Sequence, residues 1–228
     1  MKKVIFSVGG SILFKEGDVN LQVVNDLKEF LEKTKGKYKV GIVVGGGKYA
    51  RIYIDFAKKL GLPTLVQHAI GVELTQLHAK LLAYALNIEE FFCKTFEEAE
   101  VMFERKGYFV LGGVVPGYTT DWDAAVMAER VKADILVNIT NVEGVYDKDP
   151  DVYPDAKFFE ELDWKTFYKI FESEGIEFKP GMNFVFDPRA AKICENAAIP
   201  VFIIKYDKIK DLYDYLEGKK KVTGTLIK

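Results

Sequence analysis

The fold is decided by residues 40–51, which read Val40-Gly41-Ile42-Val43-Val44-Gly45-Gly46-Gly47-Lys48-Tyr49-Ala50-Arg51. A short apolar run meets three consecutive glycines and then a helical pattern, which predicts a buried parallel strand that turns directly into a helix. Because glycine has no Cβ, the backbone can approach a ligand closely, and the first N–H groups of the helix attract anions. Lys48 and Arg51 lie one turn apart and would add cationic donors. The stretch therefore predicts a phosphate cradle.

Two other interpretations fit this stretch. Glycine-rich turns between a strand and a helix also occur for close packing alone. The spacing Gly45-x-Gly47-x-x-Ala50 also fits a dinucleotide-binding turn, but that site needs an acidic residue at the end of a second strand about 20 residues further on. The stretch from Thr64 to Ala69 offers no such residue. Close packing stays open as the alternative, and a nicotinamide site is disfavoured.

Composition limits the functions that the chain can have. Its 228 residues, 49% of them hydrophobic, suffice for one large α/β domain or two small ones. With 32 basic and 34 acidic residues the net charge is −2, which argues against sequence-independent nucleic-acid binding. Two cysteines form no disulfide framework, Met1-Lys2-Lys3 leads into a strand and not into a signal peptide, and no apolar run approaches the roughly 18 residues of a membrane span. We expect a cytoplasmic protein with neither a nucleic-acid nor a membrane partner.

Apolar patterns predict strands and helices that alternate along the chain. The expected strands cover residues 3–8, 40–44, 108–111, 135–139, 201–204 and, at an edge of the sheet, 222–227. The expected helices cover residues 21–33, 69–86, 124–131, 165–171 and 208–216, with others after Gly47 and from Pro188. Because crossovers between parallel strands are right-handed and place helices on the faces of the sheet, we predict an α/β fold, a three-layer α/β/α sandwich with a largely parallel central sheet.

Four of the expected loops follow strands and carry ligand-binding residue types. The first is Gly9-Gly10-Ser11, the second holds the glycine triplet, and the third runs from Gly112 to Asp121 and ends in Thr-Thr-Asp before a helix. The fourth, residues 140–150, is polar with Tyr146 inside it, which suits stacking on a base. Loops that follow parallel strands gather at the carboxyl edge of the sheet, where open α/β sheets bind ligands. The set predicts a ligand with more than one phosphate and a base.

The two histidines are ten residues apart, at His68 and His78. This spacing places them on different faces of the expected helix, so we expect no shared metal site. For His78 we favour a packing or surface role. Residues 179–182, Lys179-Pro180-Gly181-Met182, are expected to form a mobile flap.

With these loops the chain resembles the amino acid kinase family and, within it, the archaeal type of UMP kinase. The matching segments are Val8-Gly9-Gly10-Ser11, Val44 to Lys48 with Ala50-Arg51, Pro116 to Asp121 with Ala124-Ala125, Thr140 to Tyr146 with Asp149-Pro150, Asp187-Pro188 with Ala190 to Ile193, and Gly224 to Ile227. They run in the family's order from end to end. The resemblance implies one domain over residues 1–228, with an acceptor-binding half at roughly 1–132 and an ATP-binding half at 133–228, and a homohexameric assembly.

The resemblance also implies roles for individual residues. The ATP phosphates would be held by Gly10, Ser11, Gly47 and Arg51, and the adenosine by Thr140, Tyr146 and Asp149. UMP would be held by Gly46, His68, Val114, Val115, Pro116, Gly117, Tyr118, Thr119 and Thr120, with both threonines near its phosphate. Lys48 or Arg51 would supply the catalytic charge, because Ser7 stands where much of the family carries Lys. Mg²⁺ would enter bound to ATP, since it prefers phosphate oxygens and waters to a protein cage.

Two positions depart from the archaeal UMP kinase pattern and leave the acceptor open. His68 stands where those enzymes usually carry Asp on the uridine side, and Thr75-Gln76 stands where they usually carry Thr-Arg. One alternative is a kinase of the same fold that acts on another small phosphate or carboxylate. Another is a binding or storage protein that depends on nucleotide but has lost turnover.

Overall fold

The computed structural model describes residues 1–15, 17–148, 150, 152–173 and 185–228. In this part of the chain, eight strands form one central sheet. In order across the sheet they are β10 (Glu161–Leu162), β12 (Thr225–Ile227), β11 (Val201–Lys205), β7 (Ile135–Thr140), β1 (Lys2–Val8), β4 (Tyr38–Val44), β6 (Tyr108–Leu111) and β5 (Phe92–Cys93). The six strands from β11 to β5 are parallel, whereas β12 is antiparallel to β11 and β10 runs parallel to β12. The predicted largely parallel sheet is confirmed.

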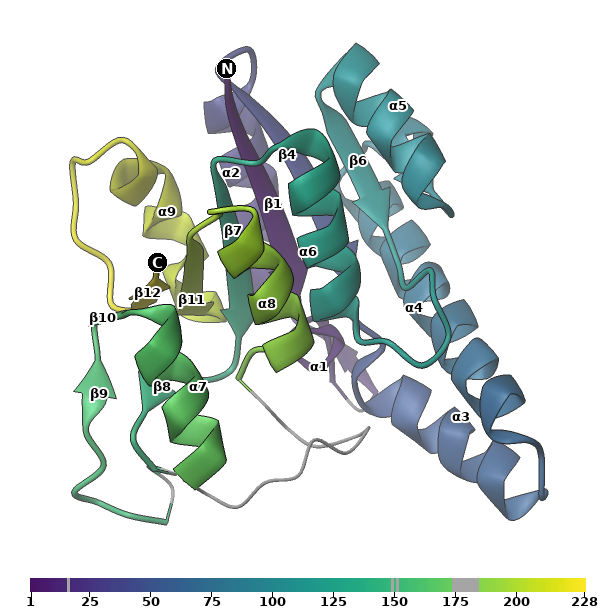
Figure 1. The fold of residues 1–228 in the computed structure, drawn as a ribbon. Coiled ribbons are helices and arrows are strands. Elements are labelled where there is room, and N and C mark those ends of the chain that lie inside the picture. Colours follow the sequence, from purple (N-terminus) through teal and green to yellow (C-terminus); the bar gives the residue numbers. More distant parts are fainter. Residues whose placement is uncertain (16, 149, 151, 174–184) are drawn as a thin grey trace.

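Helices cover both faces of this sheet (Figure 1). The described helices of eight or more residues are α2 (Leu21–Thr34), α3 (Gly47–Lys59), α4 (Thr64–Ala85), α5 (Phe96–Lys106), α6 (Thr120–Val131), α7 (Trp164–Ser173), α8 (Pro188–Asn196) and α9 (Ile209–Leu216). Buried residues of α2, α4 and α9 share one apolar cluster with the sheet, and buried residues of α5, α6, α7 and α8 share another. The molecule is therefore the three-layer sandwich that the sequence predicts.

The central strand β1 contributes to both clusters because its side chains alternate between the two faces. Val4, Phe6 and Val8 join the cluster of α2, while Ile5 joins that of α6. Ser7 follows Ile5 on the α6 side and is 2% exposed. The alternation thus turns one polar side chain of β1 toward the start of α6.

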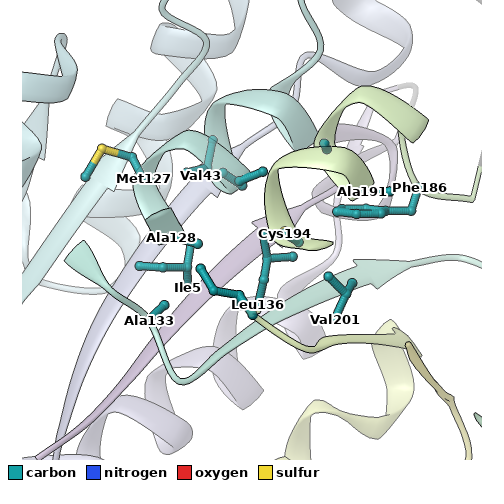
Figure 2. Packing of buried hydrophobic residues seen from close by; sticks show 14 of the residues in the cluster. Ile5, Val43, Met127, Ala128, Ala133, Leu136, Phe186, Ala191, Cys194 and Val201 are labelled. Atoms are coloured by element: carbon teal, nitrogen blue, oxygen red, sulfur yellow. The ribbon is translucent and has the colours of Figure 1, made fainter. Parts of the chain in front are cut away.

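Small residues let two helices approach the sheet closely. Ala124, Ala125 and Ala128 of α6 and Ala190 and Ala191 of α8 have no exposed surface. Figure 2 shows Ala128 and Ala191 packed with Ile5, Leu136 and Val201 of three neighbouring strands. Alanine leaves little side chain between a helix and a sheet, so both helices pack close to the strands.

Two sequence predictions need correction. The helix expected from Ala69 begins at Thr64, directly after Pro63, because proline cannot continue a helix but readily precedes one. His68 therefore lies inside α4. The strand expected at 222–227 is only Thr225–Ile227, and it is not an edge strand because β10 pairs outside it. A strand of two residues such as β10 leaves no periodic signal in the sequence.

Short elements complete the described structure. They are helix α1 (Gly10–Leu13), the hairpin of β2 (Phe14–Lys15) with β3 (Asp18–Val19), the hairpin of β8 (Val145–Tyr146) with β9 (Phe158–Phe159), and 3-10 turns η1 (Glu89–Phe91) and η2 (Tyr206–Lys208). None of the helices in the described ranges combines the length and the apolar character that crossing a membrane requires.

Candidate active site

The four loops singled out in the sequence follow four neighbouring strands. In the sheet order β7-β1-β4-β6, each strand is followed at its carboxyl end by one loop: residues 141–144, Gly9, residues 45–46 and residues 112–119. Gly9 N–H donates to Ile139 O of β7 at 3.1 Å, and Gly45 N–H donates to Val8 O of β1 at 2.9 Å. These bonds bind each loop to the end of the adjacent strand. The predicted gathering of the loops is confirmed.

The first two glycine loops touch backbone to backbone. A methyl group added to Gly10 would lie 2.2 Å from Gly45 O and 2.5 Å from Gly47 N. Both distances are shorter than non-bonded atoms allow. Gly47 also has φ of +56°, a conformation that favours glycine. Close packing, which the sequence left open as an alternative, is thus one reason for the glycines. It does not compete with phosphate binding, because α1 and α3 both begin at this contact with their first N–H groups unpaired within the helix.

Cationic side chains of α3 lie beside these loops. Arg51 Nη2 donates to Ser11 Oγ at 3.3 Å, so the guanidinium reaches from the second loop to the first. Lys48 is exposed in the first turn of α3. The structure therefore brings together Gly10, Ser11, Gly47 and Arg51, which the resemblance assigns to the ATP phosphates.

The third loop is anchored from two sides. Gly113 N–H donates to Thr75 Oγ1 of α4 at 2.6 Å, and Gln76 Nε2 donates to Gly113 O at 3.2 Å. On the other side, Val114 N–H donates to Asp123 Oδ2 of α6 at 3.4 Å. Gln76 is therefore a structural donor to this loop. The loop is held between α4 and α6 before it reaches its exposed tip.

The tip of this loop carries most of the residues expected to contact the acceptor. Thr119 is the N-cap of α6, where its Oγ1 accepts from Trp122 N–H at 3.3 Å and donates to Asp187 Oδ2 at 2.5 Å. Thr120 Oγ1 would lie 3.2 Å from a methyl group on Gly45, which places it against the second loop. His68 Nδ1 would lie 3.5 Å from a methyl group on Gly117. The structure places His68 against the loop that carries Thr119, which the resemblance assigns to the acceptor.

The fourth loop is only partly described. Thr140 ends β7, and its hydroxyl donates to Asn141 Oδ1 at 3.3 Å. Tyr146 lies in β8, with its ring 5.3 Å from the ring of Phe158. Asp149 and the expected flap at 179–182 lie outside the described residues.

Comparison with known proteins identifies the family. Residues 2–205 match the sequence model of the amino acid kinase family. The chain belongs to the amino acid kinase family. Among curated relatives, a uridylate kinase of Methanoregula boonei is 39% identical over 95% of this chain and 92% of its own, and one of Thermococcus sibiricus is 36% identical over 99% of both. The crystal structure of uridylate kinase from Archaeoglobus fulgidus superposes with a TM-score of 0.82 at 34% identity and covers all of both chains.

Two carboxyl groups lie beneath the loops of this amino acid kinase fold. Asp121 Oδ1 accepts from Ser7 Oγ at 2.6 Å, and its Oδ2 accepts from Asp187 N–H at 3.4 Å. Burial raises the pKa of Asp121 to about 6; the Asp187 carboxylate adds to this rise, and the Ser7 hydrogen bond opposes it. Asp123 is 1% exposed, and its Oδ1 has no hydrogen-bond partner among the described residues. Burial raises the pKa of Asp123 to about 7.

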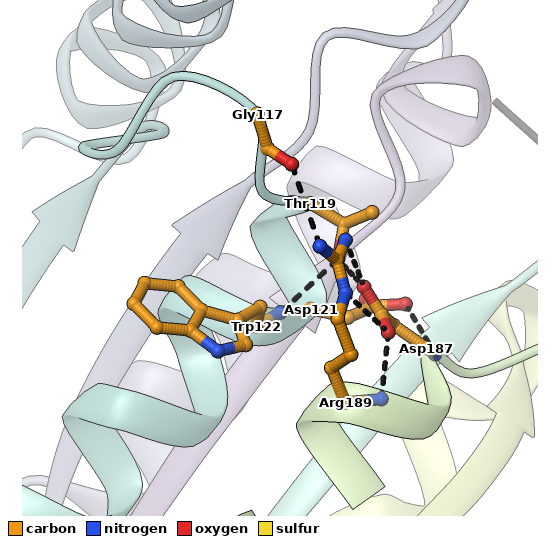
Figure 3. A network of polar contacts seen from close by, with 6 residues as sticks. All are labelled: Gly117, Thr119, Asp121, Trp122, Asp187 and Arg189. Atoms are coloured by element: carbon orange, nitrogen blue, oxygen red, sulfur yellow. Dashed lines mark hydrogen bonds and ion pairs between the residues drawn. The ribbon is translucent and has the colours of Figure 1, made fainter. Parts of the chain in front are cut away.

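A polar network around Asp187 was not predicted from the sequence. Asp187, which belongs to one of the segments that match the family, caps α8 by accepting from Arg189 N–H at 2.8 Å. It also accepts from Thr119, and the guanidinium of Arg189 lies against it (Figure 3). Nothing in the local sequence pairs residue 119 with residue 187. Their contact depends on the packing of α6 beside α8.

His78 has the packing role that we favoured. It is 5% exposed, and its ring lies 4.3 Å from the ring of Phe14. Its Nδ1 is 3.1 Å from Gly45 O, so an Nδ1 proton would be donated to the second glycine loop. Burial lowers the pKa of His78, which favours the neutral ring.

Stability should depend on pH through the buried carboxyl groups of α6. The pKa of Asp123 rises from its ordinary 3.8 to about 7 on folding, so the folded chain binds a proton more tightly than the unfolded chain between these values. The free energy of unfolding should therefore fall as the pH rises from about 4 to about 7. In urea unfolding at about pH 8, Asp123→Asn should be more stable than the native protein, and the gain should shrink toward acid pH.

Asp155→Asn serves as the control for this test. The hydrogen bond from Lys148, at 2.7 Å, lowers the pKa of the exposed Asp155. A carboxyl group with a lowered pKa stabilises the folded chain as the pH rises, whereas Asp123 destabilises it. The Asp155→Asn variant should therefore still lose stability between about pH 4 and 7. An unchanged slope in Asp123→Asn would show that this carboxyl is ionised in the folded protein at neutral pH.

Proposed function

We propose that this chain transfers the γ-phosphoryl group of ATP to UMP, giving UDP and ADP, a step of pyrimidine nucleotide biosynthesis. The observation that carries the proposal is the match to relatives named uridylate kinase. One of these matches extends over 99% of the chain and therefore includes all four strand-end loops. A resemblance in fold alone would support only membership of the family. Sequence identity to uridylate kinases along the full length supports the same acceptor.

The proposed ATP-binding half is roughly residues 133–228, assisted by the first two glycine loops. The phosphates would lie on Gly10, Ser11 and Gly47, where two helices begin side by side and no Cβ intervenes. Thr140, Tyr146 and Asp149 would hold the adenosine. For Tyr146 this proposal is supported by its place in the hairpin that follows the end of β7.

The proposed acceptor half is roughly residues 1–132. UMP would lie against His68, Gly46 and the third loop, with its phosphate at the start of α6. The loop residues proposed for this role are Val114, Val115, Pro116, Gly117, Tyr118, Thr119 and Thr120. Because the Thr119 hydroxyl already donates to Asp187, the donors proposed for the phosphate are Thr120 and backbone N–H groups at the start of α6.

Little covalent chemistry is required of the protein. A bond forms between an oxygen of the UMP phosphate and the γ-phosphorus, and the bond from that phosphorus to the β-γ bridging oxygen breaks. The acceptor is already an anion and needs no general base. Arg51, beside Ser11, would stabilise the charge on the moving group, and Lys48 would assist it. Mg²⁺, which we propose enters with ATP, would neutralise phosphate charge.

An acceptor screen tests this function directly. With ATP and Mg²⁺, we expect ADP release with UMP and much less with other nucleoside monophosphates or with small phosphates and carboxylates. Preferred use of another acceptor would assign the chain to a different substrate within the family. The structural reason to test this outcome is His68, which lies beside Gly117 of the third loop. ATP binding without ADP release for any acceptor would support a binding protein.

Arg51→Ala should lower kcat about 100-fold, because a guanidinium at the transferring phosphate is worth several kcal/mol in the transition state. Circular dichroism should remain native, since Arg51 is exposed. Arg105→Ala, at another exposed position at the end of α5, is the matched control and should keep native turnover. Equal activities of the two variants would remove Arg51 from the catalytic site.

We also propose that copies of this chain assemble into a homo-oligomer, a homohexamer by resemblance to its family. The support is an apolar surface on the α3–α4 hairpin, which projects at the lower right of Figure 1. Phe56 is 51% exposed, Leu60 75% and Leu65 69%. Apolar side chains grouped in this way mark contact surfaces, and the proposed occupant is the same hairpin of a second copy.

Light scattering after size-exclusion chromatography tests the assembly. The double variant Leu60→Glu/Leu65→Glu should elute as a smaller species than the native protein, because carboxylates are costly to bury in an apolar contact. Leu21→Glu, at a leucine of α2 that is 67% exposed, should keep the native size. A native protein that is monomeric would contradict the proposal.

A further inference from the structure

Arg189 binds Asp187, the N-cap residue of α8, through its side chain as well as through its backbone N–H. Its Nη2 lies 3.2 Å from Asp187 Oδ2 and its Nε 3.4 Å from Asp187 Oδ1, so the guanidinium holds both carboxylate oxygens. Asp187 is 4% exposed, and a buried carboxylate requires such a partner. Capping alone needs only Arg189 N–H, which donates to Oδ1 at 2.8 Å. The side chain therefore has a function beyond the cap.

The same guanidinium extends to the tip of the third loop (Figure 3). Its Cζ lies 4.9 Å from the centre of the Tyr118 ring, and its Nη1 is 3.5 Å from Gly117 O. The carboxylate that it holds accepts from Thr119 Oγ1. Three consecutive residues of the loop, 117 to 119, are thus bound to the start of α8 through one ion pair.

Tyr118 lies between Arg189 and the first turn of α6 and contacts both. Its ring lies 4.0 Å from the ring of Trp122, in the first turn of the helix, at an interplanar angle of 32°. The order of contact is Arg189, Tyr118, Trp122, with one residue from α8, one from the loop and one from α6. Aromatic rings and a guanidinium stack with little conformational freedom. The stack therefore fixes the loop at the point where α6 begins.

We propose that Arg189 is a positioning residue for the acceptor: by holding residues 117–119 against α8, it sets the affinity for the nucleoside monophosphate. This rests on the proposed function. Arg189 belongs to the half of the chain assigned to ATP, yet the loop that it holds is assigned to the acceptor. Its removal should therefore affect the acceptor and leave ATP binding, on the loops of β1, β4 and β7, nearly unchanged.

Steady-state kinetics test the role. Arg189→Ala should raise KM for UMP about tenfold, with less than about a twofold change in KM for ATP, because a loosened loop must be ordered when the acceptor binds. Arg189→Lys keeps the positive charge but loses the two-pronged hydrogen bonding to the carboxylate and the planar group that stacks on Tyr118. Its KM for UMP should therefore lie between those of the native protein and Arg189→Ala. A merely structural role would change both KM values or neither.

The control is Lys192→Ala on the same helix. Lys192 also makes an ion pair, with Glu195 at 2.8 Å, and also lies over a tyrosine ring, that of Tyr168 at 6.0 Å. These contacts do not involve the third loop. Lys192→Ala should keep both KM values. Equal effects of the two alanine substitutions would overturn the proposal.

Tryptophan fluorescence tests the same contact without any activity. The chain has two tryptophans, Trp122 and Trp164, so Trp164→Phe leaves Trp122 as the reporter. Adding Arg189→Ala to this variant should increase quenching of Trp122 by acrylamide, and adding Lys192→Ala should not. Unchanged quenching would overturn the proposal. If the native protein did not phosphorylate UMP, the proposed function would fail, and quenching alone would decide whether Arg189 holds the loop.

Discussion

The site depends on the backbone contact between two loops that contain no Cβ atoms at the points of closest approach. Gly10 lies against Gly45 and Gly47 at distances that no other residue tolerates. Because β1 and β4 are adjacent and parallel, the two loops leave the sheet side by side, and the helices that follow them begin at the same place. Two helix N-termini then lie side by side, with Arg51 across their junction, an arrangement that favours an anion. A side chain at any of these glycines would separate the loops before it touched a ligand.

Beside β1 and the third loop the fold desolvates two carboxyl groups, at a cost in stability. Asp121 and Asp123 lie in the first turn of α6, where a helix N-terminus favours negative charge, yet burial raises the pKa of both. Desolvation therefore outweighs the helix terminus. Ser7 supplies a hydroxyl where much of the family carries a lysine, so it binds the carboxyl of Asp121 without neutralising it. Such perturbed groups cluster at functional sites, and these two lie beside β1 and the third loop.

Helices α6 and α8, which are far apart in the sequence, pack against each other. Both helices are rich in buried alanine, approach the sheet closely and begin with capping side chains, Thr119 and Asp187, that bond to each other. A capping side chain normally bonds to the N–H groups of its own helix. Here the two capping side chains also bond to each other and so link the starts of the two helices. The third loop and the start of α8 are consequently one hydrogen-bonded unit. The geometry of this loop is thereby tied to a residue more than sixty positions away in the chain.

The sequence by itself determined the layers, the parallel sheet and the four loops, because glycine runs after apolar strands are local signals with a direct conformational meaning. It also predicted that these loops gather, since loops that follow parallel strands meet at one edge of the sheet. It did not determine where α4 begins, the position of β12 inside the sheet, or the partners of Asp187. Those were decided by tertiary structure: β10 is too short to leave a pattern, and the contact of Thr119 with Asp187 exists only because two helices distant in sequence pack side by side. Local patterns specify which groups are available, and packing specifies which of them meet.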